Sequence, residues 1–234
     1  MKKIQTYIDG FDEVLGGGIP QGHVVLVCGT PGTMKTSMTY SIMYENAKRE
    51  GKKGLYISLE ENYDGLKGAM LDLGMEGIDE LPVYMIDVGK IRQTHVGQDI
   101  SKNWLDVLQK YIKKRVEEND FDIIVIDSLA ALYSLTEMMN PRAELFHFVR
   151  FLKEIRASVF LISEITYGSK ALVSHDEDFL VDGIIHLKMH EVGESDFQLR
   201  INCVKMRRTK HTRGWHVLIH KPSKGFTTTP IISD

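Results

Sequence analysis

The chain has 234 residues, of which 43% are hydrophobic and 26% charged, a composition typical of a globular protein and not of a disordered one. Its 29 lysines and arginines and 32 aspartates and glutamates give a net charge of −3, which argues against a protein that coats nucleic acid through bulk charge. Cys28 and Cys203 are too few for a disulfide framework, so both are expected to be reduced and buried. The sequence offers neither a signal peptide nor an apolar run of membrane-spanning length, so we expect a cytoplasmic protein without membrane contact.

Short apolar runs of strand length alternate with longer amphipathic stretches. Strands are predicted at 24–28, 54–59, 83–88, 123–126, 159–163 and 183–187, and helices at 36–50, 63–73, 101–119 and 141–157. β-branched runs without polar alternation are typical of strands buried on both faces, so this order predicts an α/β fold with a mostly parallel twisted sheet flanked by helices. The segments 196–206 and 215–219 alternate and predict an antiparallel C-terminal extension. Since no linker divides the chain, one domain spanning 1–234 is expected.

The segment 29–36, GTPGTMKT, stands between a predicted strand and a predicted helix, as a phosphate-binding loop (P-loop, Walker A) requires. Its backbone N–H groups would point at phosphate oxygens, and the start of the helix adds positive potential. Lys35 would reach the β- and γ-phosphates, and the Thr36 hydroxyl would bind Mg²⁺. The residues expected to contact the nucleotide are Thr30, Pro31, Gly32, Thr33, Met34, Lys35, Thr36 and Ser37.

Met34 departs from the usual pattern, which has glycine before the lysine. A Cβ atom resists the backbone angles and the close approach that glycine permits. The backbone N–H group survives the change, so phosphate binding is still expected. A site that binds nucleotide but turns it over slowly is one interpretation of this departure, and the sequence leaves the effect of Met34 on turnover open.

Carboxylates follow two further predicted strands. Asp127 ends the apolar run 123–126 and is expected to hold Mg²⁺ through water, as such residues do in P-loop proteins. Glu60 and Glu61 follow the run 54–59, where a carboxylate can align and deprotonate an attacking water. An ordinary solvated turn would give the same acidic pair, but its position between the P-loop and Asp127 favours a catalytic role.

Two longer segments carry a family resemblance. The lead-in 10–22, GFDEVLGGGIPQG, and the segment 205–211, KMRRTKH, resemble the KaiC-like branch of the RecA-superfamily ATPases, and the likeness runs from about residue 5 to about residue 225. It implies a RecA-like P-loop core and a homo-oligomeric ring, often a hexamer, with ATP and Mg²⁺ at the subunit interfaces. Arg208 stands where the family usually has glycine.

The resemblance also implies residue roles. Glu60, of the pair Glu60–Glu61, would activate water. Lys205 and Arg207 would reach across to the γ-phosphate held by the neighbour, and His211 would belong to the same nucleotide-binding segment. Such a cation supplied in trans can be worth roughly 10³–10⁵ in rate.

Some KaiC domains phosphorylate a Ser–Thr pair just before the late strand. Asp178 and Phe179 occupy the matching positions and carry no hydroxyl, so no autophosphorylation is expected there. The function implied is that of an ATP-hydrolysing regulatory protein.

Two alternatives stay open. RecA relatives bind DNA through loops that match 136–142 and 167–182 here; the second loop carries acids that would repel phosphate, although Arg208, Lys210 and Arg213 could serve instead. The other alternative is a nucleotide-dependent switch that binds ATP without hydrolysis and acts on an unidentified protein partner, which Met34 and Arg208 would suit. No metal other than nucleotide-bound Mg²⁺ is expected.

Overall fold

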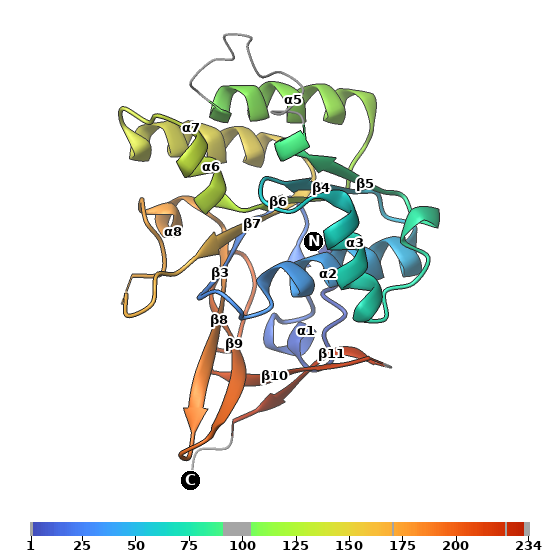
Figure 1. Cartoon of the computed structure of the whole chain (residues 1–234), viewed down its shortest axis with the longest axis vertical. Coiled ribbons are helices and arrows are strands. Elements are labelled where there is room, and N and C mark those ends of the chain that lie inside the picture. Colours follow the sequence, from blue (N-terminus) through green and yellow to red (C-terminus); the bar gives the residue numbers. More distant parts are fainter. Residues whose placement is uncertain (1, 91–103, 170, 223, 232–234) are drawn as a thin grey trace.

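The computed structural model describes residues 2–90, 104–169, 171–222 and 224–231, which fold around a nine-stranded sheet (Figure 1). Its strands lie in the order β11-β10-β9-β8-β3-β7-β6-β4-β5. Their bounds are β3 (Val24–Gly29), β4 (Gly54–Ser58), β5 (Val83–Asp87), β6 (Ile123–Asp127), β7 (Ser158–Glu164), β8 (Gly183–Val192), β9 (Asp196–Met206), β10 (His216–Lys221) and β11 (Gly225–Pro230). A separate small sheet pairs β1 (Lys3–Ile4) with β2 (Ile19–Pro20).

The strands from β8 to β5 in this order pair in parallel, and β8–β9, β9–β10 and β10–β11 pair antiparallel. The predicted fold class is therefore confirmed. The extension is longer than predicted, because the tail adds β11 as a further strand. Its threonines, Thr227 to Thr229, are β-branched residues of the kind that strands favour, and they pair with β10.

Helices cover both faces of the sheet: α2 and α3 lie on one face, and α5, α6 and α7 on the other (Figure 1). Alternate residues of β3 enter the two cores, Val25 and Val27 on the α2 side and Val24 and Leu26 on the other. The apolar run of β3 follows from this double burial. The helices are α1 (Phe11–Val14), α2 (Lys35–Glu50), α3 (Tyr63–Asp72), α5 (Trp104–Glu118), α6 (Leu129–Leu135), α7 (Pro141–Glu154) and α8 (Glu177–Leu180), with a 3₁₀ turn η1 (Ile78–Glu80). The start of the helix predicted at 101–119 lies outside the described residues.

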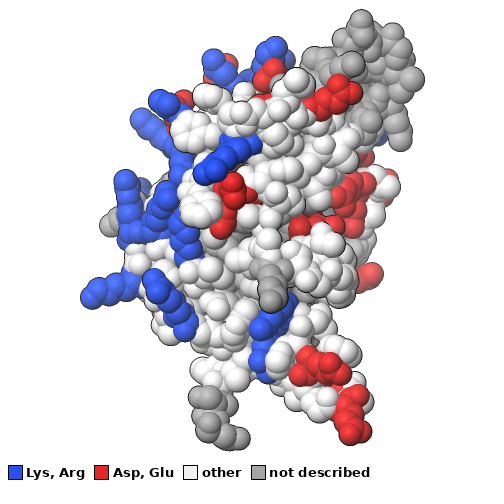
Figure 2. All heavy atoms as spheres, turned by 90° about the vertical axis from the view of Figure 1, so that its left-hand side faces the viewer, with Lys and Arg blue, Asp and Glu red and all other residues white. Residues whose placement is uncertain are grey.

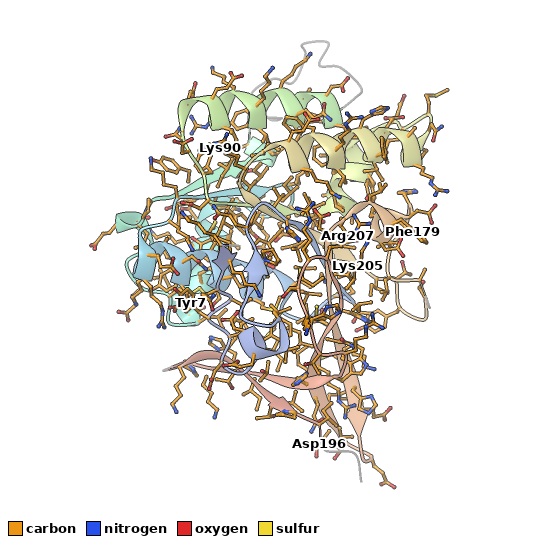
Figure 3. The ribbon with its side chains drawn as sticks, turned by 180° about the vertical axis from the view of Figure 1, so that it is seen from behind. Tyr7, Lys90, Phe179, Asp196, Lys205 and Arg207 are labelled. Atoms are coloured by element: carbon orange, nitrogen blue, oxygen red, sulfur yellow. The ribbon has the colours of Figure 1, made fainter. Side chains whose placement is uncertain are left out.

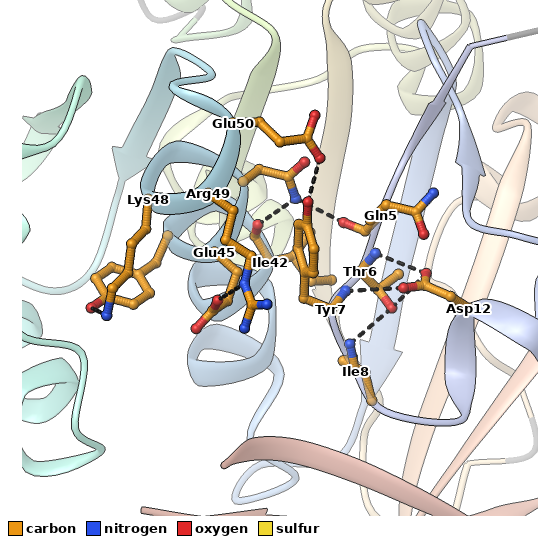
Figure 4. Close-up of polar contacts among 12 residues, drawn as sticks. Gln5, Thr6, Tyr7, Ile8, Asp12, Ile42, Glu45, Lys48, Arg49 and Glu50 are labelled. Carbon is orange, nitrogen blue, oxygen red and sulfur yellow. Dashed lines mark hydrogen bonds and ion pairs between the residues drawn. The ribbon is translucent and has the colours of Figure 1, made fainter. Parts of the chain in front are cut away.

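The N-terminal segment packs along the second half of α2 (Figure 4). The amide of Asn46 donates to the Gln5 carbonyl at 2.7 Å, and the Tyr7 hydroxyl donates to Glu50. The guanidinium of Arg49 lies over the Tyr7 ring, 4.7 Å from its centroid. Asp12 accepts backbone N–H bonds from this segment, one of them from Tyr7 at 3.1 Å. The lead-in is thus fixed against the helix that starts at the P-loop.

The glycine run after α1 permits close contacts between backbones. Gly16 has φ 64°, and a Cβ atom there would lie 2.3 Å from the carbonyl oxygen of Lys210. Gly18 has φ 104°, and its Cβ would lie 2.6 Å from the carbonyl oxygen of Ile4. The lead-in therefore contacts the 205–211 segment directly, which only glycine allows. Among the described residues, none of the helices has the length and apolar character that crossing a membrane requires.

Candidate functional site

The P-loop connects β3 to α2. Two side chains of the loop donate hydrogen bonds to one backbone carbonyl within it. The Thr33 hydroxyl donates to the Thr30 carbonyl at 2.7 Å, and Lys35 Nζ donates to the same oxygen at 3.0 Å. Met34 precedes the helix with φ 57° and ψ 28°, which is the left-handed conformation. This is the conformation for which glycine is the default residue. Methionine adopts it here, and its partly buried side chain packs against the core beside α2.

Lys35 is 6% exposed, and its Nζ lies 3.8 Å from Glu164 at the end of β7. Burial lowers the pKa of Lys35, and the negative charges of Glu164 and Asp127 oppose that shift. A phosphate group beside the ammonium would offset the same cost of burial. Glu164 was missed by the sequence analysis. It could have been found as the acid that ends the predicted strand 159–163, next to the P-loop strand.

Asp127 ends β6 and accepts two hydroxyl hydrogen bonds on one carboxylate oxygen. Thr36 donates to it at 2.8 Å and Tyr56 at 2.5 Å. Burial raises the pKa of Asp127, and the two hydrogen bonds oppose the shift. Tyr56 was also missed, because in sequence it is one apolar residue of a buried strand. A buried tyrosine hydroxyl needs a partner, and this requirement is the signal that was available.

The two residues expected at the metal, Thr36 and Asp127, are thus in direct contact. A hydroxyl oxygen and a carboxylate oxygen are the hard ligands that Mg²⁺ prefers, so the donor set fits that ion. Among the described residues, no group of three or more His, Cys, Asp and Glu side chains could hold a metal ion by itself.

The acidic pair after β4 divides into two roles. Glu60 is exposed, and one of its carboxylate oxygens accepts a hydrogen bond from the Ser128 hydroxyl at 2.7 Å. Glu61 uses its backbone to close the turn: its N–H donates to Ser58 Oγ at 3.0 Å, and its carbonyl accepts from the same hydroxyl at 2.6 Å. The side chain of Glu60 is hydrogen-bonded to Ser128, which caps α6 and follows Asp127 in the chain. The geometry therefore favours Glu60 as the carboxylate that could accept a proton.

These side chains share one edge of the sheet. β3, β4, β6 and β7 run parallel, so their carboxyl ends meet there, with Ser58 opposite Asp127 and Gly29 opposite Glu164 in the register. In open α/β sheets, ligands bind in the crevice outside these ends.

Lys205 and Arg207 lie elsewhere. Lys205 pairs with Ile184, which pairs with Leu26, three residues before the P-loop strand ends at Gly29. At the rise of a strand this is about 10 Å, and Arg207 lies further toward the amino end. The structure therefore does not bring these two cations to their own P-loop.

The 205–211 segment has two further features. Arg208 has φ 58°, so it takes a left-handed conformation, as Met34 does. Both ring nitrogens of His211 are buried and have no hydrogen-bond partner among the described residues.

Figure 2 shows a wider asymmetry of charge: lysines and arginines gather along one side of the face drawn, and aspartates and glutamates along the other.

Comparison with known proteins gives a consistent result. A family model described as "ATPase: KaiC" matches residues 4–230. A UPF0273 protein of Saccharolobus solfataricus is 30% identical, over 90% of this chain and 77% of its own length. The circadian clock oscillator protein KaiC 1 of Synechocystis sp. is 28% identical over 92% of this chain, which spans only 42% of that longer protein. The crystal structure of a KaiC-like protein from Pyrococcus horikoshii superposes with a TM-score of 0.82 at 25% identity, covering 98% of this chain and 99% of that one.

Proposed function

Because this chain belongs to the KaiC ATPase family, we propose that it binds and hydrolyses ATP in a Mg²⁺-dependent reaction, within a regulatory ring of copies of itself. The observation that carries the proposal is the convergence of Lys35, the Thr36–Asp127 pair and Glu60 on one edge of the sheet. We further propose that residues 1–234 act as one ATPase domain.

The chemistry assigned to each residue follows from its contacts. The P-loop and Lys35 would bind the phosphates, and Thr36 with Asp127 would hold Mg²⁺, which neutralises charge on the phosphate oxygens. Glu60, oriented by the Ser128 hydroxyl, would take a proton from water as the water oxygen bonds to the γ-phosphorus and the bond to ADP breaks.

The second half of the site would come from a neighbouring copy. Lys205 and Arg207 lie about 10 Å or more along the sheet from their own P-loop, and their side chains bind residues in and just after α8, so a second subunit would present them to the γ-phosphate. The separation of cations from acids in Figure 2 suits head-to-tail contact between identical subunits, because such a contact joins two different faces. Contacts of that kind give a closed ring, in this family often of six subunits, when the rotation between neighbours closes.

The test is the ATPase rate per subunit, measured with Mg²⁺ over a range of protein concentrations. We expect a specific rate that rises and then saturates as subunits assemble. Arg207→Ala should lower the saturated rate by roughly 10³-fold or more, whereas Arg115→Ala, on α5, should leave it unchanged. A specific rate that is independent of concentration while the protein goes from monomer to ring would refute completion in trans.

Two alternatives predict other outcomes. ATP binding without turnover at any concentration would favour a nucleotide-dependent switch. Met34→Gly, which restores the glycine of the usual motif, would then be the first variant to test. Salt-dependent binding of single-stranded DNA would favour a recombinase-like protein. In the second candidate DNA loop Glu177 is buried, and Arg142 of the first loop lies 3.4 Å from Asp176. This pairing leaves Arg142 less available for DNA.

A further inference from the structure

Backbone carbonyls in and just after the short helix α8 bind two cations of the 205–211 segment, Lys205 and Arg207. Lys205 Nζ donates to the Asp178 carbonyl at 2.8 Å and to the Val181 carbonyl at 2.9 Å. Arg207 donates to the Phe179 carbonyl at 3.3 Å and to the Asp182 carboxylate, just after α8, also at 3.3 Å (Figure 3). Backbone carbonyls move with their helix, so the position of α8 contributes to the positions of the Lys205 ammonium and the Arg207 guanidinium.

A buried carboxylate fixes α8 to α6. Glu177 is 1% exposed; one of its oxygens accepts from the Tyr133 hydroxyl, and the other accepts from the His175 N–H at 2.8 Å. The ring of Tyr133 also contacts the His175 ring, with centroids 4.9 Å apart. Burial, together with the charge of Glu177, raises the pKa of Tyr133, so the phenol remains a hydrogen-bond donor. A buried carboxylate is costly unless it is hydrogen-bonded in this way.

The other end of α6 lies at the candidate nucleotide site. Ser128 caps the helix by accepting from the Ala131 N–H, and its hydroxyl donates to Glu60. Asp127 is the preceding residue. One helix of seven residues therefore runs from the residues that would bind this subunit's nucleotide to the hydrogen bond that fixes α8.

We propose that the hydrogen bond between Tyr133 and Glu177 positions Lys205 and Arg207 for the nucleotide of the neighbouring subunit. Tyr133 and Glu177 are thus positioning residues that act through α8 and touch no nucleotide themselves. This inference rests on the proposed function, since it requires that the two cations act in trans.

The experiment mixes two defective chains. Lys35→Ala removes the phosphate site but keeps the cations, and Arg207→Ala does the reverse. If the site is completed in trans, the mixture regains ATPase activity that neither chain has alone. Tyr133→Phe is then placed in one partner at a time.

In the Lys35→Ala chain, which donates the cations, Tyr133→Phe should lower the regained activity by about tenfold or more, because a displacement of about 1 Å can cost that much. In the Arg207→Ala chain, which supplies only the nucleotide site, it should have little effect. Tyr167→Phe in the Lys35→Ala chain is the matched control, since Tyr167 is 74% exposed on the segment before α8. Glu177→Gln keeps an oxygen acceptor and should cost less than Glu177→Ala.

The outcomes separate the two proposals. A mixture of the unmodified defective chains that regains no activity would overturn completion in trans, and with it this inference. A mixture that regains activity but loses it equally with Tyr133→Phe in either chain would overturn the inference alone. A general folding defect lowers activity whichever chain carries the substitution, whereas a positioning role requires the substitution to act in the cation-donating chain. Full activity with Tyr133→Phe in the cation-donating chain would overturn it as well.

Discussion

Met34 lets the cost of a left-handed residue in the P-loop be measured directly. Both Met34→Ala and Met34→Gly remove the partly buried side chain, so its packing cancels when the two variants are compared. What remains is the Cβ atom at φ 57° and ψ 28°, where an L-residue costs about 1–2 kcal/mol. Elsewhere glycine is the less stable choice by roughly 0.5–1 kcal/mol relative to alanine, so the two effects have opposite signs.

We expect the left-handed strain to exceed that entropy cost, so Met34→Gly should be more stable than Met34→Ala by up to about 1.5 kcal/mol. Relative to the unaltered chain, Met34→Gly gains this relief but loses about 1 kcal/mol of packing, taken as half of the value for a fully buried methionine. Its free energy of unfolding should therefore stay close to that of the unaltered chain.

Urea unfolding measures these differences. A difference of about 1 kcal/mol moves the midpoint by roughly 0.4 M if the slope is about 2.5 kcal/mol/M. Met139 provides the control, because it is 97% exposed and does not have a positive φ; there the glycine variant should be no more stable than the alanine variant. If the alanine variant exceeded the glycine variant in stability by the same amount at position 34 as at position 139, the left-handed conformation could not be the reason that the usual motif has glycine before the lysine.

Three further outcomes are expected. Tyr56→Phe removes a buried donor to Asp127 and should destabilise the protein by about 1.5–3 kcal/mol; an unchanged urea midpoint would contradict this. Burial raises the pKa of Asp127, so just above the ordinary carboxyl pKa the folded protein binds more protons than the unfolded chain. The free energy of unfolding of the metal-free protein should therefore fall as the pH rises through that window. Asp127→Asn should remove this part of the pH dependence, and an identical pH dependence in the variant would exclude Asp127 as its source. Burial raises the pKa of both cysteines, Cys28 and Cys203, to about 12, so neither should react with a thiol reagent at pH 8 until the protein unfolds, and labelling of the native protein would refute the burial.

The sequence was sufficient for the parts of this protein that depend on near neighbours in the chain. The order of strands and helices, the parallel sheet and the strand–loop–helix at Lys35 and Thr36 follow from local apolar runs and from loop residues whose spacing is fixed. The strand that ends in Asp127 was predicted for the same reason. The tail strand β11 was not, because its short run of threonines becomes a strand only by pairing with β10.

Only the tertiary structure decided the contacts between residues that are distant in the chain. It brought Tyr56 to Asp127 and Glu164 to Lys35, and it placed Glu177 in the interior. No local pattern specifies such pairs, because each depends on how two strands or helices are placed across the sheet. The position of Arg207 is of the same kind: its cationic character is plain in the sequence, but its distance from its own P-loop is set by the register of β9, β8 and β3.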